Sequence, residues 1–344
     1  MPPIVETRDL TRWFGANLAL DHLNLQIPEG AIFGFIGPNG AGKTTTMRIL
    51  TTLLQPSGGE GYVAGISIAR DPRGVRRVVG FMPDFFGVYD NMKSWEYLDF
   101  FGRSYGVPAA RRSALIGELL ELVDLAHKRD ELVMNLSRGM KQRLSLARTM
   151  MHDPRLLILD EPASGLDPRA RIELRELLKE LRALGKTIMI SSHILSELAE
   201  MCTHIAIIER GRLLASGDVQ DILRSLQPHR SLELRVLGAA ARAEELLRGF
   251  QGVLSVRRET PAPASEGEAP PPAEASVEAT AAEGEAATAD GRGELLLVDF
   301  AGDERGMAEL LAHLVAGGVP VTRFAEQSGD LEDIFLHVTK GIVS

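Results

Sequence analysis

The sequence is poor in cysteine, which occurs once in 344 residues, at Cys202. A single cysteine excludes an intramolecular disulfide, and a reducing compartment such as the cytosol is the simplest setting for such a chain. Lone cysteines usually behave as small apolar residues packed in a core. We expect that role for Cys202.

A long apolar run is also missing. No uninterrupted stretch approaches the roughly 18–20 residues that a membrane-spanning helix needs. The first residues, Met1–Glu6, contain neither the basic nor the apolar region of a secretory signal. We therefore expect a cytoplasmic protein that reaches a membrane only through a partner.

Positive charge is scarce, since the formal net charge is −9 at pH 7. Domains that bind nucleic acid are usually basic, so no nucleic-acid partner is expected. Aromatic residues make up only 5%, while hydrophobic residues reach 44% and charged residues 25%, which is ordinary for a globular protein. The length allows two domains, each with a core of its own.

Residues 1–226 alternate short apolar runs with longer amphipathic stretches, which predicts an α/β domain with a largely parallel sheet. A mainly helical subdomain is expected at about residues 94–151. Helices are expected over Lys43–Leu54 and Lys141–Met151. The expected strands are Ala31–Ile36, Val78–Met82, Leu156–Asp160, Thr187–Ser191, Ile205–Glu209 and Arg212–Ala215.

Residues 227–344 are predicted to form a small α+β domain of ferredoxin-like fold. Within it, residues 259–293 consist mostly of Pro, Ala, Glu, Gly, Ser and Thr, so we expect a disordered acidic loop. On each side of that loop the pattern reads βαβ, as in a split-βαβ sandwich. The expected elements are strands at Ser231–Leu237, Val253–Arg257, Glu294–Phe300 and Val319–Phe324, and helices at Ala239–Phe250, Glu304–Ala316 and Asp330–Val338.

A phosphate-binding loop is expected at Gly37–Thr44 (GPNGAGKT), between an apolar strand and a helix. Glycines let backbone N–H groups turn toward phosphate oxygens, and the helix adds its positive N-terminal end. Lys43 supplies a full charge to the β- and γ-phosphates of ATP, and the Thr44 hydroxyl can ligate Mg²⁺. The predicted nucleotide-binding residues here are Pro38, Asn39, Gly40, Ala41, Gly42, Lys43, Thr44 and Thr45.

Two acids, Asp160 and Glu161, follow the apolar run Leu156–Leu159. Ligands of open α/β sheets bind at the carboxyl ends of the strands, so these acids are expected beside the phosphate loop. Asp160 is predicted to hold Mg²⁺, directly or through water, as in other phosphate-loop enzymes. Glu161 is then free to act as the general base that activates the attacking water.

From Ile4 to Leu226 the ordered motifs resemble those of ATP-binding subunits of ABC transporters. The signature segment (Leu136–Gln142, LSRGMKQ) is similar to the family's LSGGQ motif and precedes the Asp160–Glu161 strand. The D-loop (Ser164–Asp167) comes next. His193, directly after a strand, resembles the switch histidine that contacts the γ-phosphate and is counted with Glu161 and Lys43 as catalytic.

The resemblance also implies an adenine-stacking aromatic residue and a dimer. Phe14 occupies the position of the aromatic residue, with Trp13 as a competitor and core packing of Phe14 as the alternative. In the family, ATP and Mg²⁺ are buried between the phosphate loop of one subunit and the signature segment of another. Ser137 and Gly139 would therefore contact the nucleotide of a second copy of the chain.

Two departures from the family pattern stand out. The signature segment has Arg138 where glycine is usual, which would add positive charge near a phosphate, and Met140 where glutamine is usual. Asp84 takes the place of the glutamine that touches both Mg²⁺ and the permease. A carboxylate about 4 Å from an unscreened phosphate charge costs roughly 4 kcal/mol at an effective dielectric of about 20. Asp84 must therefore either ligate Mg²⁺ or swing away, and we predict that it lies within reach of Mg²⁺ in the ATP-bound state.

Together with these departures, the tail Asp330–Phe335 (DLEDIF) resembles one branch of the family, the separate ATPase subunits of exporters related to drug-resistance and sodium-extrusion pumps. The expected partner is a separately encoded permease, docked on the helical subdomain and on residues 84–95, where Phe85, Phe86 and Tyr89 are either contacts or core residues. The alternative is a non-transport ABC ATPase used in assembly or regulation. A GTPase or small-molecule kinase would leave the signature segment and His193 unexplained.

Overall fold

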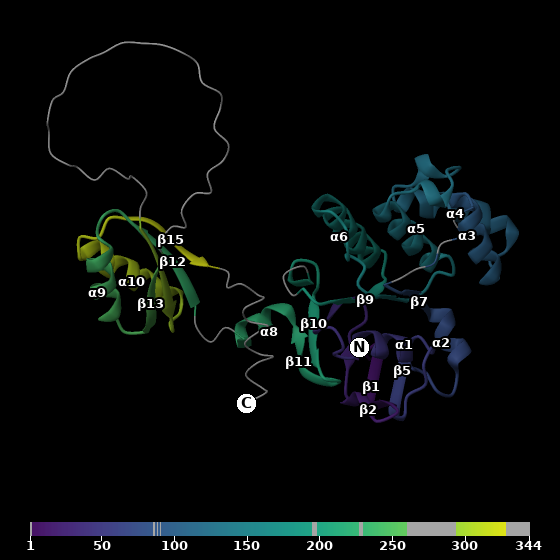
Figure 1. The fold of residues 1–344 in the computed structure, drawn as a ribbon, viewed down its shortest axis with the longest axis horizontal. Coiled ribbons are helices and arrows are strands. Elements are labelled where there is room, and N and C mark those ends of the chain that lie inside the picture. The colour runs from purple at the N-terminus through teal and green to yellow at the C-terminus, as the bar shows by residue number, and fades with distance from the viewer. Residues whose placement is uncertain are drawn as a thin grey trace, which may run out of the picture. The chain divides into compact units, whose positions relative to one another are not determined.

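The computed structural model describes residues 2–84, 87, 89, 91–194, 198–226, 230–259 and 294–327. They form two compact units, one that extends to Leu226 and one within residues 227–330 (Figure 1). The expected acidic loop apart from Glu259, the expected helix at Asp330–Val338, and Phe85 and Phe86 lie outside the described residues. In the described part of the chain, no helix combines the length and the apolar character needed to cross a bilayer.

A six-stranded sheet forms the centre of the first unit, in the order β11-β10-β4-β9-β8-β7. Neighbouring strands of this sheet pair in parallel, except that the edge strand β11 is antiparallel to β10. Every residue of β4, β8 and β9 is buried, as expected for strands covered on both faces. These strands confirm the predicted parallel sheet: β4 (Ile32–Ile36), β7 (Val79–Met82), β8 (Leu156–Leu159), β9 (Thr187–Ser192), β10 (His204–Glu209) and β11 (Arg212–Asp218).

A second, antiparallel sheet precedes and flanks the first and was not predicted from the sequence. Its strands are β1 (Val5–Phe14), β2 (Asn17–Leu23), β3 (Gln26–Ile27), β5 (Gly58–Val63) and β6 (Ile66–Ser67). Its inward-facing side chains share one buried cluster with β4 and with α1 (Lys43–Leu50). The two sheets therefore enclose the helix that follows the phosphate loop.

Helix α1 is one turn shorter than the predicted Lys43–Leu54. It ends at Leu50 because Thr52 takes up a left-handed conformation (φ 60°) and the N–H groups of Leu53 and Leu54 both return to the Arg48 carbonyl. These bonds satisfy a carbonyl at the helix end in the manner of a C-terminal cap.

The helical subdomain contains α3 (Ser94–Ser104), α4 (Ala109–Leu122), two 3₁₀ turns (Ala126–Lys128 and Val133–Asn135) and α5 (Arg138–Met150). Helix α5 begins three residues before the predicted Lys141. Ser137 is the reason, because its Oγ accepts the Met140 N–H (3.3 Å) and caps the helix inside the signature segment.

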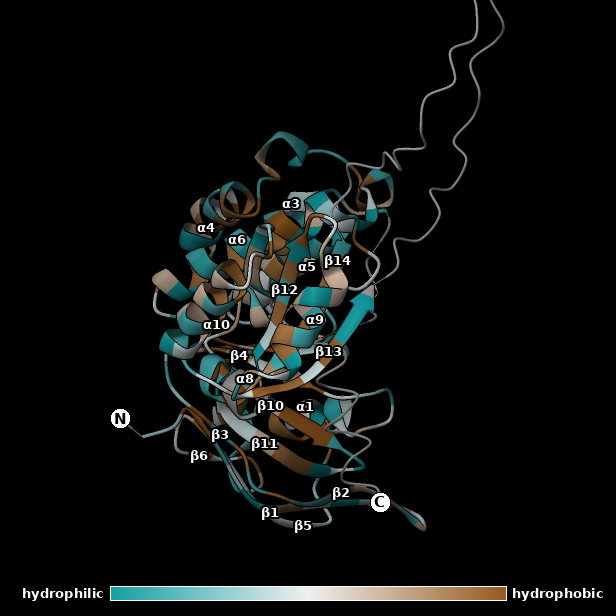
Figure 2. Ribbon diagram, turned by 90° about the vertical axis from the view of Figure 1, so that its left-hand side faces the viewer, coloured by the Kyte–Doolittle hydropathy of each residue, from teal (hydrophilic) through white to brown (hydrophobic). Residues whose placement is uncertain are grey.

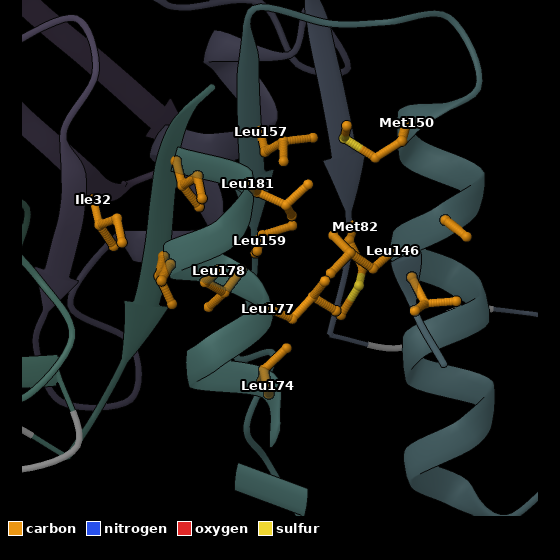
Figure 3. Packing of buried hydrophobic residues seen from close by; sticks show 14 of the residues in the cluster. Ile32, Met82, Leu146, Met150, Leu157, Leu159, Leu174, Leu177, Leu178 and Leu181 are labelled. Atoms are coloured by element: carbon orange, nitrogen blue, oxygen red, sulfur yellow. The ribbon is translucent and has the colours of Figure 1, made fainter. Parts of the chain in front are cut away.

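Helix α6 (Pro168–Ala183) joins the helical subdomain to the central sheet. Figure 3 shows its leucine stripe facing β8 and the Leu146 and Met150 side chains of α5 within one buried cluster. The helix starts at a cap in which Asp167 Oδ1 accepts the Ala170 N–H (2.8 Å). The remaining helices of the first unit with described bounds are α2 (Pro72–Val78) and α8 (Val219–Leu226).

The second unit has the predicted ferredoxin-like topology. Four antiparallel strands stand in the order β13-β14-β12-β15, and α9 (Ala240–Arg248) and α10 (Glu304–Ala316) contribute to a single core with them. Both helices alternate between hydrophobic and hydrophilic stretches in Figure 2, as amphipathic helices that cover a core do. The strands are β12 (Arg230–Val236), β13 (Val253–Glu259), β14 (Glu294–Phe300) and β15 (Val321–Gln327).

Candidate functional site

The loop between β4 and α1 is held in a shape that only glycine allows at several positions. A β-carbon on Gly37 would collide with the Ile208 carbonyl oxygen of β10. Gly40 (φ 83°) and Gly42 (φ 110°) have left-handed backbones. The Gly211 N–H donates to the Ala41 carbonyl (2.9 Å), so the turn after β10 supports the loop from outside. The backbone can therefore approach a ligand closely.

Lys43 points back into this loop. Its side chain is only 6% exposed, and Nζ donates to the Gly37 carbonyl (2.6 Å) and, at 3.4 Å, to the Pro38 carbonyl. Nζ also lies 3.4 Å from Glu161 Oε1. A buried ammonium is costly unless oxygen atoms surround it, and here loop carbonyls and a carboxylate do so.

The ends of β8 and β9 bring three more of the predicted groups together. Asp160 is 1% exposed, and its Oδ1 accepts the Ser191 hydroxyl (2.6 Å), while Ser191 Oγ accepts the Glu161 N–H (2.9 Å). Glu161 has a left-handed backbone (φ 50°). Its Oε2 lies 2.9 Å from His193 Nδ1. Glu161 thus links Lys43 to His193.

These groups open into a polar cavity of about 630 Å³. Most of the predicted residues line it, but the buried Ala41 and Asp160 and the signature residues Ser137 and Gly139 are not among its lining residues. The lining residues are Phe14, Asn17, Leu18, Ala19, Pro38, Asn39, Gly40, Gly42, Lys43, Thr44, Thr45, Asp84, Glu161, Ser164, His193 and Arg210.

Four of the lining residues were not predicted as site residues at all. Asn17, Leu18 and Ala19 begin β2, and Arg210 follows β10. Arg210 follows the carboxyl end of a parallel strand. The rule that ligands of open α/β sheets bind at the carboxyl ends of the strands, which predicted Asp160 and Glu161, could therefore also have predicted Arg210. The β2 residues come from the unpredicted antiparallel sheet, so the sequence offered no comparable signal.

Phe14 meets the geometry of an aromatic stacking residue. Its ring lines the cavity and is 46% exposed, which rules out the core-packing alternative. The Arg12 guanidinium stands 4.6 Å from the ring centroid. Trp13 is equally exposed but does not line the cavity.

Asp84 lines the same cavity as Glu161. Burial raises the pKa of Asp84, and repulsion from the carboxylates of Asp160 and Glu161 adds to the rise, while Arg138 opposes it. Three acids therefore share this edge of the site.

The donor atoms near the start of α1 fit Mg²⁺. Thr44 offers a hydroxyl, and Asp160 and Asp84 offer carboxylates, all of them hard oxygen ligands. Within the described ranges, no group of three or more His, Cys, Asp and Glu side chains is placed to hold a metal by itself. Mg²⁺ commonly binds through one or two carboxylates together with substrate phosphates.

The signature segment presents a helix N-terminus rather than a cavity. Ser137 caps α5, and the first-turn N–H groups of Arg138 and Gly139 have no acceptor within the helix. Such N–H groups suit an anion. Gly139 faces α6, where an added β-carbon would lie 3.6 Å from Leu166 Cδ2 and 3.7 Å from Ala170 Cβ.

The site has the features of a phosphate-loop nucleoside triphosphatase. These are a parallel sheet, a glycine loop that surrounds a buried lysine, and two acids at the end of a strand of the same sheet. Residues 20–164 match the family model described as ABC transporter. The chain is 38% identical over 225 residues to the Nod factor export ATP-binding protein I of Cupriavidus metallidurans, which covers 65% of this chain and 74% of that protein. The chain therefore belongs to the family of ABC transporter ATP-binding subunits, which bind ATP and couple its hydrolysis to transport.

Other relatives and solved structures agree. The bacitracin transport ATP-binding protein BcrA of Bacillus licheniformis is 41% identical over 215 residues, which cover 62% of this chain and 69% of that protein. The daunorubicin/doxorubicin resistance ATP-binding protein DrrA of Streptomyces peucetius is 36% identical over 240 residues, 70% of this chain and 72% of that one. A solved ATP-binding subunit of an ABC transporter is 31% identical, with a TM-score of 0.59 over 64% of this chain and 92% of that chain.

Replacing Phe14 with alanine is expected to weaken ATP binding by roughly 1–3 kcal/mol, the usual value of a base stacked on an aromatic ring, and so to raise the Kd about tenfold. Titration of a fluorescent ATP analogue measures this. Trp13→Ala is the matched control, because Trp13 has the same exposure outside the cavity. Equal losses in the two variants would contradict the assignment.

Proposed function

We propose that this chain is the ATP-hydrolysing subunit that powers export of a substrate by a separately encoded membrane permease. The observation that carries the proposal is the placement of Glu161 between the Lys43 ammonium, at 3.4 Å, and His193, at 2.9 Å, on the wall of the nucleotide cavity. Export is supported by the relatives, which are named for Nod factor export and for drug resistance.

Lys43, Glu161 and His193 have different roles in hydrolysis. Lys43 leaves its contact with Glu161 when phosphate oxygens become available, because a triphosphate offers the ammonium more negative charge than one carboxylate does. Glu161 is then a free general base for the attacking water. His193 lies 2.9 Å from the other Glu161 oxygen and lines the cavity, so it would be available to contact the γ-phosphate. The loop N–H groups and the start of α1 stabilise the charge that develops on the phosphate.

Mg²⁺ would be held by Thr44, Asp160 and Asp84, and when bound it supplies positive charge to the phosphates. Asp84 is the distinctive member of this set. Its carboxylate faces those of Asp160 and Glu161, and a divalent cation turns that repulsion into attraction.

A second copy of the chain completes the site. The signature residues Ser137 and Gly139 are not among the residues that line the cavity, and the N–H groups at the start of α5 can bind an anion. ATP held by one copy would supply that anion to the other, so the nucleotide joins two copies face to face. Hydrolysis removes the shared charge and lets them part.

The permease would dock on the helical subdomain next to the Asp84 loop. Tyr89 is 51% exposed, which excludes the core-packing alternative for this residue, and its ring packs edge-to-face on the exposed Phe100 (centroids 5.3 Å apart). An exposed aromatic pair suits an amphipathic partner helix. The chain would thus be peripheral at the inner face of the membrane. Residues 1–226 act as the nucleotide-binding domain and residues 227–344 as an accessory domain.

The permease assignment is tested by purifying the tagged chain from detergent-solubilised membranes of its native cell. A polytopic membrane protein is expected to co-purify and to stimulate ATP hydrolysis. The double variant Tyr89→Ala/Phe100→Ala is expected to reduce its recovery at least about tenfold, since interface aromatics often dominate binding energy. The control is Leu53→Ala/Leu184→Ala, which removes two exposed apolar side chains elsewhere on the same unit. Retention of soluble partners alone would favour an assembly or regulatory ATPase.

The Mg²⁺ assignment is tested with Asp84→Gln. Loss of a carboxylate ligand is expected to raise the Mg²⁺ concentration for half-maximal hydrolysis by about tenfold. Asp130→Asn, an exposed acid of the helical subdomain, serves as the control. An unchanged Mg²⁺ dependence in Asp84→Gln would contradict a role as ligand.

A further inference from the structure

The two-residue turn between β10 and β11 lies beside the nucleotide cavity. Glu209 pairs with Arg212 across the hairpin. Arg210 and Gly211 form the turn between them, and both have left-handed backbones (φ 48° and 79°). Such a turn favours asparagine, aspartate or glycine at its first central position, because these residues tolerate the left-handed conformation. The turn geometry therefore does not account for an arginine at position 210.

The turn is fixed between β2 and the phosphate loop. The Gly211 N–H donates to the Ala41 carbonyl (2.9 Å), and the Gly211 carbonyl accepts the Asp21 N–H (3.0 Å). A β-carbon on Gly211 would lie only 2.6 Å from the Ala19 carbonyl oxygen, so the turn packs directly on β2. The backbone that carries Arg210 is thus held between two elements that line the cavity.

Strand β2 leads from the adenine side of the cavity to the phosphate loop. Asn17, its first residue, pairs with Phe14, the aromatic residue assigned to the base. Two residues further on, the Ala19 carbonyl oxygen would lie 2.9 Å from a β-carbon on Gly42, the last residue before α1. The turn packs on Ala19, so Arg210 lines the cavity between the place of the base and that of the β- and γ-phosphates. In ATP, the ribose and the α-phosphate occupy this middle stretch.

Arg210 brings an unpaired positive charge to that stretch. Its side chain is exposed and lines the cavity. Across the residues that the structure describes, no carboxylate comes within ion-pair distance of its guanidinium, and this includes Asp84 and Glu161, which line the same cavity. Lys43, the other Lys or Arg side chain among the lining residues, already contacts Glu161 (3.4 Å) and the loop carbonyls. The guanidinium of Arg210 is therefore available to a ligand anion.

We propose that Arg210 binds the α-phosphate of ATP, which accounts for an arginine at this turn position. A planar guanidinium with several N–H donors suits two oxygens of one phosphate. The inference rests on the proposed function and deepens it, because it adds a nucleotide-binding residue to the same cavity. The charge on the α-phosphate does not change when the bond between the β- and γ-phosphates is hydrolysed, so Arg210 contributes to binding and not to the chemical step.

Arg210→Asn removes the charge and introduces a residue that favours the left-handed conformation, so the thermal midpoint is expected to stay the same or to rise. The Kd values for ATP and for ADP, measured by competition with a fluorescent ATP analogue in excess Mg²⁺, are both expected to rise about tenfold. The Kd for adenosine, which lacks phosphate, is expected to change by less than about twofold. In steady-state hydrolysis, KM should rise about tenfold while kcat stays within about twofold.

Arg210→Lys keeps the positive charge without the planar fork, and its Kd for ATP is expected to stay within about threefold of that of the unmodified chain. Arg212→Gln is the matched control. It removes a charge from the same hairpin, but the Arg212 side chain donates to Asp21 and does not line the cavity. This control is expected to leave the Kd for ATP within about twofold.

Equal losses in Arg210→Asn and Arg212→Gln, or a loss for adenosine as large as that for ATP, would overturn the assignment. A loss for ATP without one for ADP would place the guanidinium at the γ-phosphate and would contradict it as well. The absence of ATP binding and hydrolysis by the unmodified chain would instead contradict the proposed function.

Discussion

The structure of the first unit depends on how it accommodates one buried positive charge. The Lys43 ammonium sits among the carbonyls of Gly37 and Pro38 and beside the Glu161 carboxylate. Leaving such a charge unpaired would cost several kcal/mol, so these oxygens must be held in place. The glycines, the parallel strands that end at the same edge, and the Ser191 hydroxyl that ties Asp160 to Glu161 all serve that arrangement. When a triphosphate binds, the Lys43 ammonium can exchange these oxygen contacts for phosphate oxygens.

The parts of the fold that follow local patterns were predictable from the sequence. The all-apolar β4 and β8 and the phosphate loop between β4 and α1 carry their own signals, and the ferredoxin-like unit follows from the order of its elements. The antiparallel sheet was not predictable in this way, because β1 carries Glu6, Arg8 and Asp9 and is fixed by pairing with distant strands. Helix ends at Leu50 and Arg138 depend on single backbone and capping events that periodicity does not reveal.

The structure also changes the interpretation of Arg138. Its place in the signature segment suggested a positive charge beside a phosphate, whereas the structure puts its guanidinium on the Ser164 carbonyl and against Gly165. The departure from the family pattern at residue 138 therefore bears on the D-loop of the same chain.

The central claim is that the described site is one half of a nucleotide sandwich, since Ser137 and Gly139 lie outside the cavity that holds Lys43. The most direct test is the mass of the Glu161→Gln variant in solution at saturating ATP and Mg²⁺, by light scattering after gel filtration. Because the variant lacks the general base, ATP should persist and hold two copies together, giving twice the mass of a single chain, whereas ADP should leave a monomer. A monomer at saturating ATP would contradict the account.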